Sequence, residues 1–137
     1  MYRALIVCLL GALIPLLPQP AAAAPVCSDT LSTAEQTRCL MKALEASDRQ
    51  LQKALAGVAQ EAKGVPGATF QSLWRENLKG FAGTSPDPVK QAESFRANRR
   101  AVCAYAKSVG FQGTGYGITT TRCELALTRT LLDELKP

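Results

Sequence analysis

Two cysteines, Cys103 and Cys123, enclose a glycine-rich stretch without Asp or Glu, CAYAKSVGFQGTGYGITTTRC. Cysteines at this distance could bind a metal, act as a redox pair or form a structural disulfide. A zinc site needs closely spaced Cys or His ligands, and a thioredoxin-like redox centre needs CxxC. The chain has no histidine and no CxxC pair. The pattern therefore favours structural disulfides and argues against a metal site.

The N-terminal stretch MYRALIVCLLGALIPLLPQPAAAAPVC has the features of a secretory signal peptide. Arg3 precedes an apolar run that ends at Pro18, and alanines suited to cleavage follow. The run is too short and too interrupted by prolines to be a transmembrane anchor. We expect residues 1–24 to be removed, so that residues 25–137 form one periplasmic or secreted domain.

Removal of the signal peptide takes away Cys8 and leaves four cysteines, which are Cys27, Cys39, Cys103 and Cys123. An even number in a small exported chain implies disulfides. Four cysteines allow three pairings, and the sequence alone does not choose among them. We favour Cys27 with Cys39 and Cys103 with Cys123, because each pair encloses a segment that must reverse direction next to a helix.

The spacing of apolar residues predicts an all-α domain of about four helices and no strand. The first helix begins with the capping box STAE, in which Ser32 caps the helix and Glu35 reaches back to it. Turn-forming stretches separate the helices, and the glycine-rich residues 110–117 are predicted to form a loop. The expected helices cover about residues 33–63, 68–80, 88–109 and 119–135.

Each predicted helix has an apolar face that we expect to point into the core. On the second helix this face is aromatic, and we interpret its aromatic side chains as core residues. The expected core positions are Leu40, Leu44, Leu51, Leu55 and Val58 on the first helix; Phe70, Leu73, Trp74, Leu78 and Phe81 on the second; Ala92, Phe95, Val102, Ala106 and Val109 on the third; and Leu127, Leu131 and Leu135, with Leu125 and Leu132, on the fourth.

Two charged residues occupy positions where the apolar pattern would place hydrophobic ones. Asp48 lies between Leu44 and Leu51, and Arg99 lies between Phe95 and Val102. A buried charge without a partner is costly, so the hypothesis is that Asp48 and Arg99 form a structural ion pair. The alternative is that both lie at the edge of the apolar face and reach solvent.

The residue types required by common enzyme mechanisms are missing or scattered. There is no histidine to act as a base, and the cysteines are expected to be oxidised. The acidic residues are dispersed along the helices, and the motif GTGYG lacks the lysine of a phosphate-binding loop. We therefore expect no enzyme activity and no cofactor.

The charge of the chain suggests what it could bind. It has 16 Lys and Arg against 11 Asp and Glu, a net charge of +5, which loses one unit with Arg3. A cluster of Arg96, Arg99 and Arg100 could attract anionic glycans or lipids of the cell envelope, although a solvated helix face explains it as well. Nucleic acid is not expected as a partner in an exported protein.

Several residues together resemble the small exported bacterial proteins of the lysozyme inhibitor LprI family. The closing CELALTR, residues 123–129, is similar to that family's last cysteine segment. The resemblance spans nearly all of the chain after the signal peptide, and it implies a helical, disulfide-bonded domain of the bacterial envelope. The other matching positions are Cys27, Thr33, Glu35, Cys39, Asp48, Leu51, Phe95, Arg99 and Cys103.

The resemblance also implies a function, which is inhibition of lysozyme-type muramidases. An inhibitor that blocks a cleft needs a protruding loop, and the predicted loop GFQGTGYG, with Phe111, Gln112 and Tyr116, is the candidate. A cationic partner lacks the electrostatic steering that an acidic inhibitor would have toward cationic lysozymes. The alternative is a structural or stress-related envelope protein that binds anionic glycans or lipids without inhibiting lysozyme.

Overall fold

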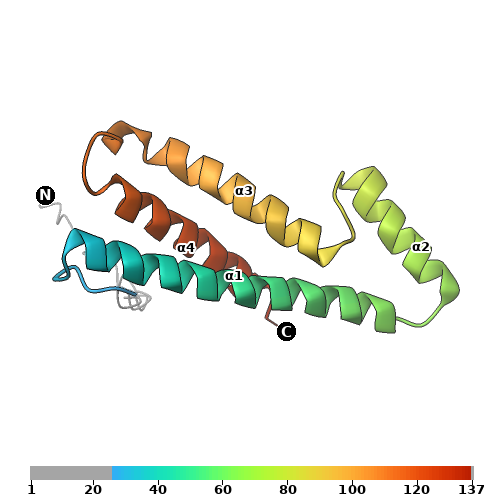
Figure 1. Ribbon diagram of the computed structural model, residues 1–137. Coiled ribbons are helices and arrows are strands. Elements are labelled where there is room, and N and C mark those ends of the chain that lie inside the picture. Colours follow the sequence, from blue (N-terminus) through green and yellow to red (C-terminus); the bar gives the residue numbers. More distant parts are fainter. Residues whose placement is uncertain (1–25, 137) are drawn as a thin grey trace, which may run out of the picture.

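The structure is a computed structural model that describes residues 26–136, and the predicted signal peptide lies outside these residues. The described part is all-α, as the sequence predicts, and no strand occurs in it (Figure 1). The main helices are α1 (Thr33–Gly64), α2 (Ala68–Glu76), α3 (Pro88–Ala106) and α4 (Tyr116–Glu134). A π-helical turn, Asn77–Phe81, extends α2, and a 3-10 turn, Ser108–Gly110, follows α3.

Helix α1 is the longest helix of the described residues, and its first turn forms as the sequence predicts. The Ser32 side chain accepts a hydrogen bond from the N–H of Glu35, and the Glu35 carboxylate accepts one from the N–H of Ser32. These bonds satisfy two donors that a helix start leaves open. Leu40 and Leu51, three turns apart on the same face, are both buried. One face of α1 therefore forms one side of the core.

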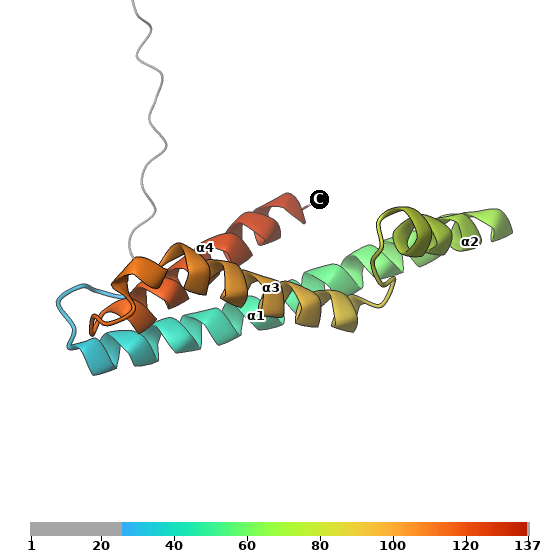
Figure 2. The same cartoon turned by 90° about the horizontal axis from the view of Figure 1, so that it is seen from above.

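Helices α3 and α4 run side by side along the first part of α1, and α2 lies at the opposite end of the molecule (Figures 1 and 2). The core lies between α1, α3 and α4. Its buried apolar residues are Cys27, Leu40, Leu51, Ala62, Ala92, Cys103, Ile118 and Leu125. Because the bundle is three helices wide at only one end, the core is concentrated there.

Two disulfides fix this end of the bundle, with the pairing that the sequence favoured. Cys27 bonds to Cys39 and so holds the segment before α1 against α1, with 6.1 Å between the two Cα atoms. Cys103 in α3 bonds to Cys123 in α4, with 5.7 Å between the Cα atoms. Each bond joins segments that reverse direction, and each restricts the unfolded chain more than the folded one.

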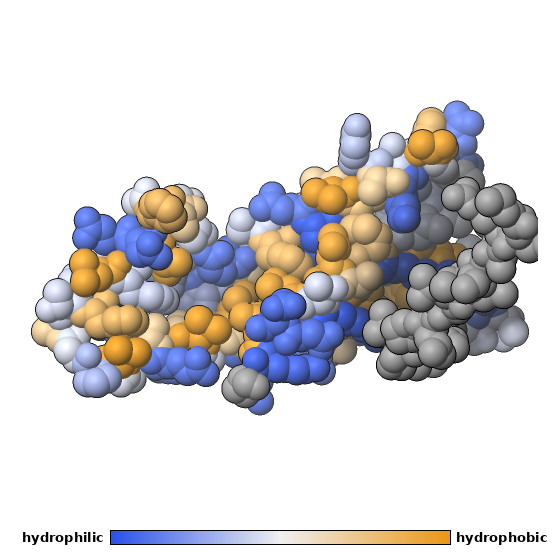
Figure 3. Space-filling model, turned by 180° about the vertical axis from the view of Figure 1, so that it is seen from behind, coloured by the Kyte–Doolittle hydropathy of each residue, from blue (hydrophilic) through white to orange (hydrophobic). Residues whose placement is uncertain are grey.

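The prediction that the apolar face of the second helix is core is wrong. No residue of α2 is buried, Leu73 is more than half exposed, and Phe81 is 91% exposed. Figure 3 shows hydrophobic side chains at the surface of the α2 end, on the left of that view. Helix α2 has only the end of α1 and the segment before α3 to pack against. Periodicity identified the face but could not show that no element covers it.

The third and fourth helices differ from the prediction in their bounds and faces. Helix α3 ends at Ala106, and Val109, predicted to be core, is fully exposed beyond it. Helix α4 begins at Tyr116, so this residue is helical and the connection is shifted to residues 107–115 from the predicted 110–117. On α4 the buried leucine is Leu125, whereas Leu127 is 39% exposed. Leu125, expected only to widen the apolar face, is therefore its most buried position.

Candidate functional site

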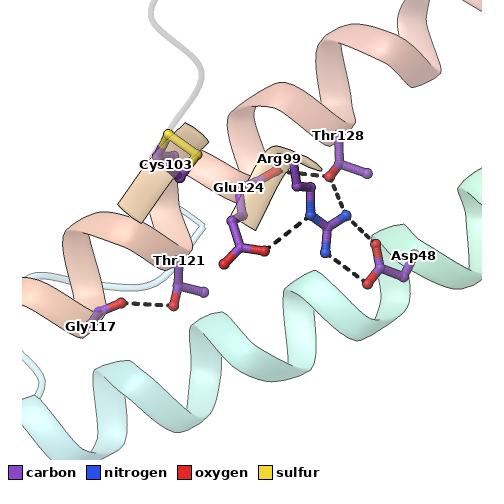
Figure 4. A network of polar contacts seen from close by, with 8 residues as sticks. Asp48, Arg99, Cys103, Gly117, Thr121, Glu124 and Thr128 are labelled. Carbon is purple, nitrogen blue, oxygen red and sulfur yellow. Dashed lines mark hydrogen bonds and ion pairs between the residues drawn. A yellow bond between two sulfur atoms is a disulfide. The ribbon is translucent and has the colours of Figure 1, made fainter. Parts of the chain in front are cut away.

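An ion-pair network centred on Arg99 of α3 connects the three packed helices (Figure 4). The guanidinium donates to both carboxylate oxygens of Asp48 on α1, with 2.9 Å from Nη2 to Oδ2. Its Nε donates to Oε2 of Glu124 on α4 at 3.1 Å, and its Nη1 donates to Oγ1 of Thr128 at 2.8 Å. The Phe95 ring lies 5.7 Å from the guanidinium carbon, within cation–π range.

The environment keeps Arg99 charged although its side chain is only 2% exposed. Burial by itself would lower the pKa of the Arg99 guanidinium, but its hydrogen bonds and charge interactions with Asp48 and Glu124 raise the pKa further above its ordinary value. Thr128 is also buried, and its hydroxyl donates to the Glu124 carbonyl at 2.8 Å. The guanidinium of Arg99 is thus engaged by side chains of both neighbouring helices.

The structure brings Asp48 and Arg99 together, as the ion-pair hypothesis has it, and adds two residues that sequence reasoning missed. Glu124 and Thr128 are one turn apart on α4 and face the same side as the buried Leu125. Their place beside the apolar face of the fourth helix is the sign in the sequence, and it becomes specific only once α4 is placed. Because the network is largely buried and its charges pair with one another, we assign it a structural role.

The connection between α3 and α4, residues 107–115, is compact, and we call it the tip. Backbone hydrogen bonds run through it, from the N–H of Gly110 to the carbonyl of Lys107 (3.1 Å), from Gly113 to Gly110 (2.9 Å) and from Tyr116 to Gly113 (3.1 Å). A Cβ at Gly113 would lie 3.3 Å from the Gly110 carbonyl oxygen, which explains a glycine there. The tip is therefore a succession of tight turns rather than an open loop.

Of the three residues predicted to form a partner-binding loop, Tyr116 lies outside the loop. It begins α4, is half-buried, and its hydroxyl donates to the carbonyl of Ala104 on α3 at 3.1 Å. Phe111 is 65% exposed, and Gln112 is exposed as well. Phe111 and Gln112 are thus on the surface of the tip, whereas Tyr116 ties the base of the tip to α3.

The surface beside the tip is unusually apolar for a solvated helix end. Tyr105 is 84% exposed and Val109 is 100% exposed, and Val102 adds to the same exposed side of α3. Hydrophobic side chains also stand out at the upper right of Figure 3, where α3 ends. Together with Phe111 these side chains form what we call the apolar patch, defined as Val102, Tyr105, Val109 and Phe111. Exposed patches of this kind mark interaction surfaces.

The charged residues on either side of the tip along the chain are all basic. No Asp or Glu occurs between Glu93 and Glu124, which covers most of α3, the tip and the first half of α4. In this stretch Arg99 is neutralised by its two carboxylates, and Arg122 forms an exposed ion pair with Asp29. Lys107 is exposed and forms no ion pair within residues 26–136. The tip therefore presents a positive charge and an apolar patch.

The arginine cluster of α3 does not form a cationic surface patch. Arg99 is buried in the network, Arg96 is half-buried, and only Arg100 is exposed. Attraction of anionic glycans or lipids depends on several exposed cations close together. The three arginines therefore give little support to that kind of partner.

Two further properties concern the kind of protein this is. In the described residues, no three His, Cys, Asp or Glu side chains are grouped so that they could hold a metal ion. Within the same part of the chain, every helix is too short or too polar to cross a membrane.

Fold and site together define a class, that of small helical domains with two disulfides, a largely buried structural ion-pair network and an exposed, partly apolar tip. The model of the family "Lysozyme inhibitor LprI" matches residues 27–135, and the chain belongs to this family. No curated protein and no solved structure matches the chain significantly. The family match covers both disulfides, the Arg99 network and the tip.

Proposed function

We propose that this protein is an exported, non-enzymatic inhibitor of lysozyme-type muramidases. The observation that supports this most strongly is the match to the lysozyme inhibitor LprI family over residues 27–135. The signal peptide predicted for residues 1–24 agrees with a role outside the cytoplasm, where disulfides form and where muramidases act.

The tip is the part of the molecule that would block the enzyme. It lies at one end of the bundle, between α3 and α4 (Figure 1), and its base is joined by the Cys103–Cys123 disulfide. Phe111 and Gln112 would make the contacts, and Tyr116 would hold the tip in place through its bond to Ala104. A segment that is already ordered loses little conformational entropy on binding, so the affinity is higher than that of a flexible loop.

The positive charge of the chain affects how such an inhibitor would associate with a lysozyme. The net charge of +5, reduced by one without Arg3, repels a cationic lysozyme at long range. Short-range contacts with the apolar patch are not affected by this repulsion. We therefore expect inhibition to persist when salt is raised, because salt screens the repulsion between the two proteins.

The test is inhibition and direct binding of the oxidised protein against chicken-type, invertebrate-type and goose-type lysozymes at two salt concentrations. We expect stoichiometric inhibition of at least one type, weakened about tenfold or more by Phe111→Ala, because exposed aromatic anchors dominate such interfaces. Phe81→Ala is the control, since Phe81 is also an exposed phenylalanine but lies at the α2 end. Absence of binding to every type would contradict the proposal.

A further inference from the structure

Lys107 is the one charged residue of the tip, and its surroundings leave its charge unbalanced. It caps the end of α3, where its N–H donates to the Cys103 carbonyl at 3.1 Å. Its side chain borders a shallow surface hollow of about 400 Å³ together with Thr119, Arg122 and Leu127. Arg122 is paired with Asp29, whereas Lys107 has no carboxylate partner in the described part of the chain. Lys107 is therefore the one charged and unpaired side chain within the tip, residues 107–115.

The position of Lys107 is also fixed. The disulfide from Cys103 to Cys123 begins one helical turn before it, and the carbonyl of Lys107 accepts the N–H of Gly110 at 3.1 Å. The backbone on both sides of Lys107 is thus held by bonds that do not depend on a partner. Tyr105 and Val109, two residues away on either side, are almost fully exposed. An exposed cation and exposed apolar side chains thus lie close along one ordered segment of backbone.

A muramidase cleft offers the complementary chemistry. Glycoside hydrolases of this kind cleave with a pair of carboxylic side chains that flank the scissile bond. The cleft itself must accept sugar rings, so its walls combine apolar surface with hydrogen-bonding groups. An apolar tip with one free cation and no carboxylate matches such a cleft in charge and in polarity, even when the rest of the enzyme surface is positive.

We propose that Lys107 enters the substrate cleft of the inhibited muramidase and forms an ion pair with one of its catalytic carboxylates, while Tyr105, Val109 and Phe111 pack against the walls of the cleft. This inference rests on the proposed inhibitor function and identifies the group that recognises the enzyme. It explains how a cationic protein can bind a cationic enzyme, because the attraction is confined to the acidic centre of the cleft.

Two other occupants of the tip fit the charges less well. A second copy of this chain would bring two tips of the same positive charge together, which is unfavourable. An anionic lipid surface could bind the lysine and the apolar patch. Such a surface binds several exposed cations more strongly than one, and Lys107 is the one charged residue of the tip itself. The single cation favours a target with a localised negative charge.

The test compares Lys107→Met with Lys90→Met, a change of the same type at an exposed lysine near the start of α3. Methionine keeps an unbranched apolar chain, so the comparison isolates the charge. Binding is measured by calorimetry against the muramidase that the protein inhibits, and against a variant of that enzyme whose catalytic carboxylates are changed to amides. We expect Lys107→Met to weaken binding to the unmodified enzyme about 30-fold, and Lys90→Met to have no effect.

The amide variant of the enzyme completes a double-mutant cycle. We expect it to bind the unmodified inhibitor less tightly and to show no further loss with Lys107→Met. If the protein inhibits a muramidase but Lys107→Met loses affinity equally against both forms of the enzyme, or not at all, the ion pair is refuted and the inhibitor function stands. If the protein binds phosphatidylglycerol vesicles and no muramidase, both the ion pair and the inhibitor function are refuted.

Discussion

The two ends of the molecule are built in different ways. The end with the tip has three helices side by side, both disulfides and the Arg99 network. The α2 end has two helices and no buried residue in α2, and no disulfide of the described residues lies in it. A side-chain hydrogen bond from Gln71 to the Ala62 carbonyl and a half-buried Trp74 connect α2 to its neighbours. Binding surfaces need an ordered base, so the difference favours the tip as the functional end.

The difference also predicts how stability is distributed. Regions with few buried contacts open locally at a smaller free energy than the whole domain. The helices around Arg99 should therefore be the last part to unfold, and α2 should be the first. The predictions below test that difference between the two ends, beginning with the largest expected effect.

Arg99→Ala should destabilise the domain most. It would leave Asp48 and Glu124 partly buried without their counter-charge, which costs about 3–5 kcal/mol in the free energy of unfolding. Urea unfolding followed by far-UV circular dichroism measures this loss. Arg100→Ala on the exposed side of α3 is the control and should change stability by less than about 0.5 kcal/mol. A similar small change for both variants would show that the network does not hold the helices together.

Removal of the Cys103–Cys123 disulfide should have the next largest effect. The double variant Cys103→Ser/Cys123→Ser should lose about 3 kcal/mol, and removal of the Cys27–Cys39 disulfide about half a kcal/mol less, because its separation is 12 residues instead of 20. Thermal and urea unfolding of both variants give the comparison. Only the loss of the Cys103–Cys123 disulfide should also weaken lysozyme inhibition. Equal inhibition by the two variants would show that inhibition does not depend on the base of the tip.

The α2 end can be followed separately because it contains Trp74, the single tryptophan of the chain. In urea, Trp74 fluorescence should change at a lower concentration than the helical circular dichroism signal, since α2 opens before the rest. Amide hydrogen exchange should likewise be faster in α2 than around Leu51 in α1. If the two optical transitions coincide, the domain unfolds as a single unit and the two ends do not differ in stability.

The smallest effect concerns acid conditions at the tip end. The hydrogen bond and charge of Arg122 lower the pKa of Asp29 below 3.8, so Asp29 contributes stability above that pH and loses it as the pH falls through the lower folded-state value. Both side chains are largely solvent-exposed, so the effect is small. Asp29→Asn should reduce the difference in melting temperature between pH 6 and pH 3. An unchanged difference would mean that this ion pair does not act in solution.

Most of the helices could be predicted because local signals decide them. The capping box at Ser32 gives the start of α1, and the aspartate–proline pair at Asp87 and Pro88 gives the start of α3. The glycines near the tip misled the prediction of α4, because Gly117 is tolerated in its first turn. The starts of α1 and α3 have side-chain caps that can be recognised in the sequence, whereas the start of α4 has none and lies three residues before the predicted one.

Burial was harder to predict than helicity, and so was the candidate site. The apolar spacing of Leu73 and Phe81 is the same as that of core residues, but whether another helix covers them depends on the position of α2 in space. The contact of Asp48 with Arg99 could be predicted because both residues interrupt apolar faces. The part that Glu124 has in the network can be recognised only once α4 is placed. Lys107 is one lysine among several in the sequence, and only its place on the tip distinguishes it.

The length of α1 has a practical consequence. Its 32 residues span about 48 Å, at about 1.5 Å per residue, and they carry α2 to the end of the molecule opposite the tip (Figure 2). A fluorescent dye attached near Phe81 would therefore lie outside the area that an enzyme bound at the tip could cover. Its rotation would slow when the complex forms, while its immediate surroundings would stay the same. Fluorescence anisotropy from that end gives a measure of binding that leaves the tip, the proposed inhibitory surface, unmodified.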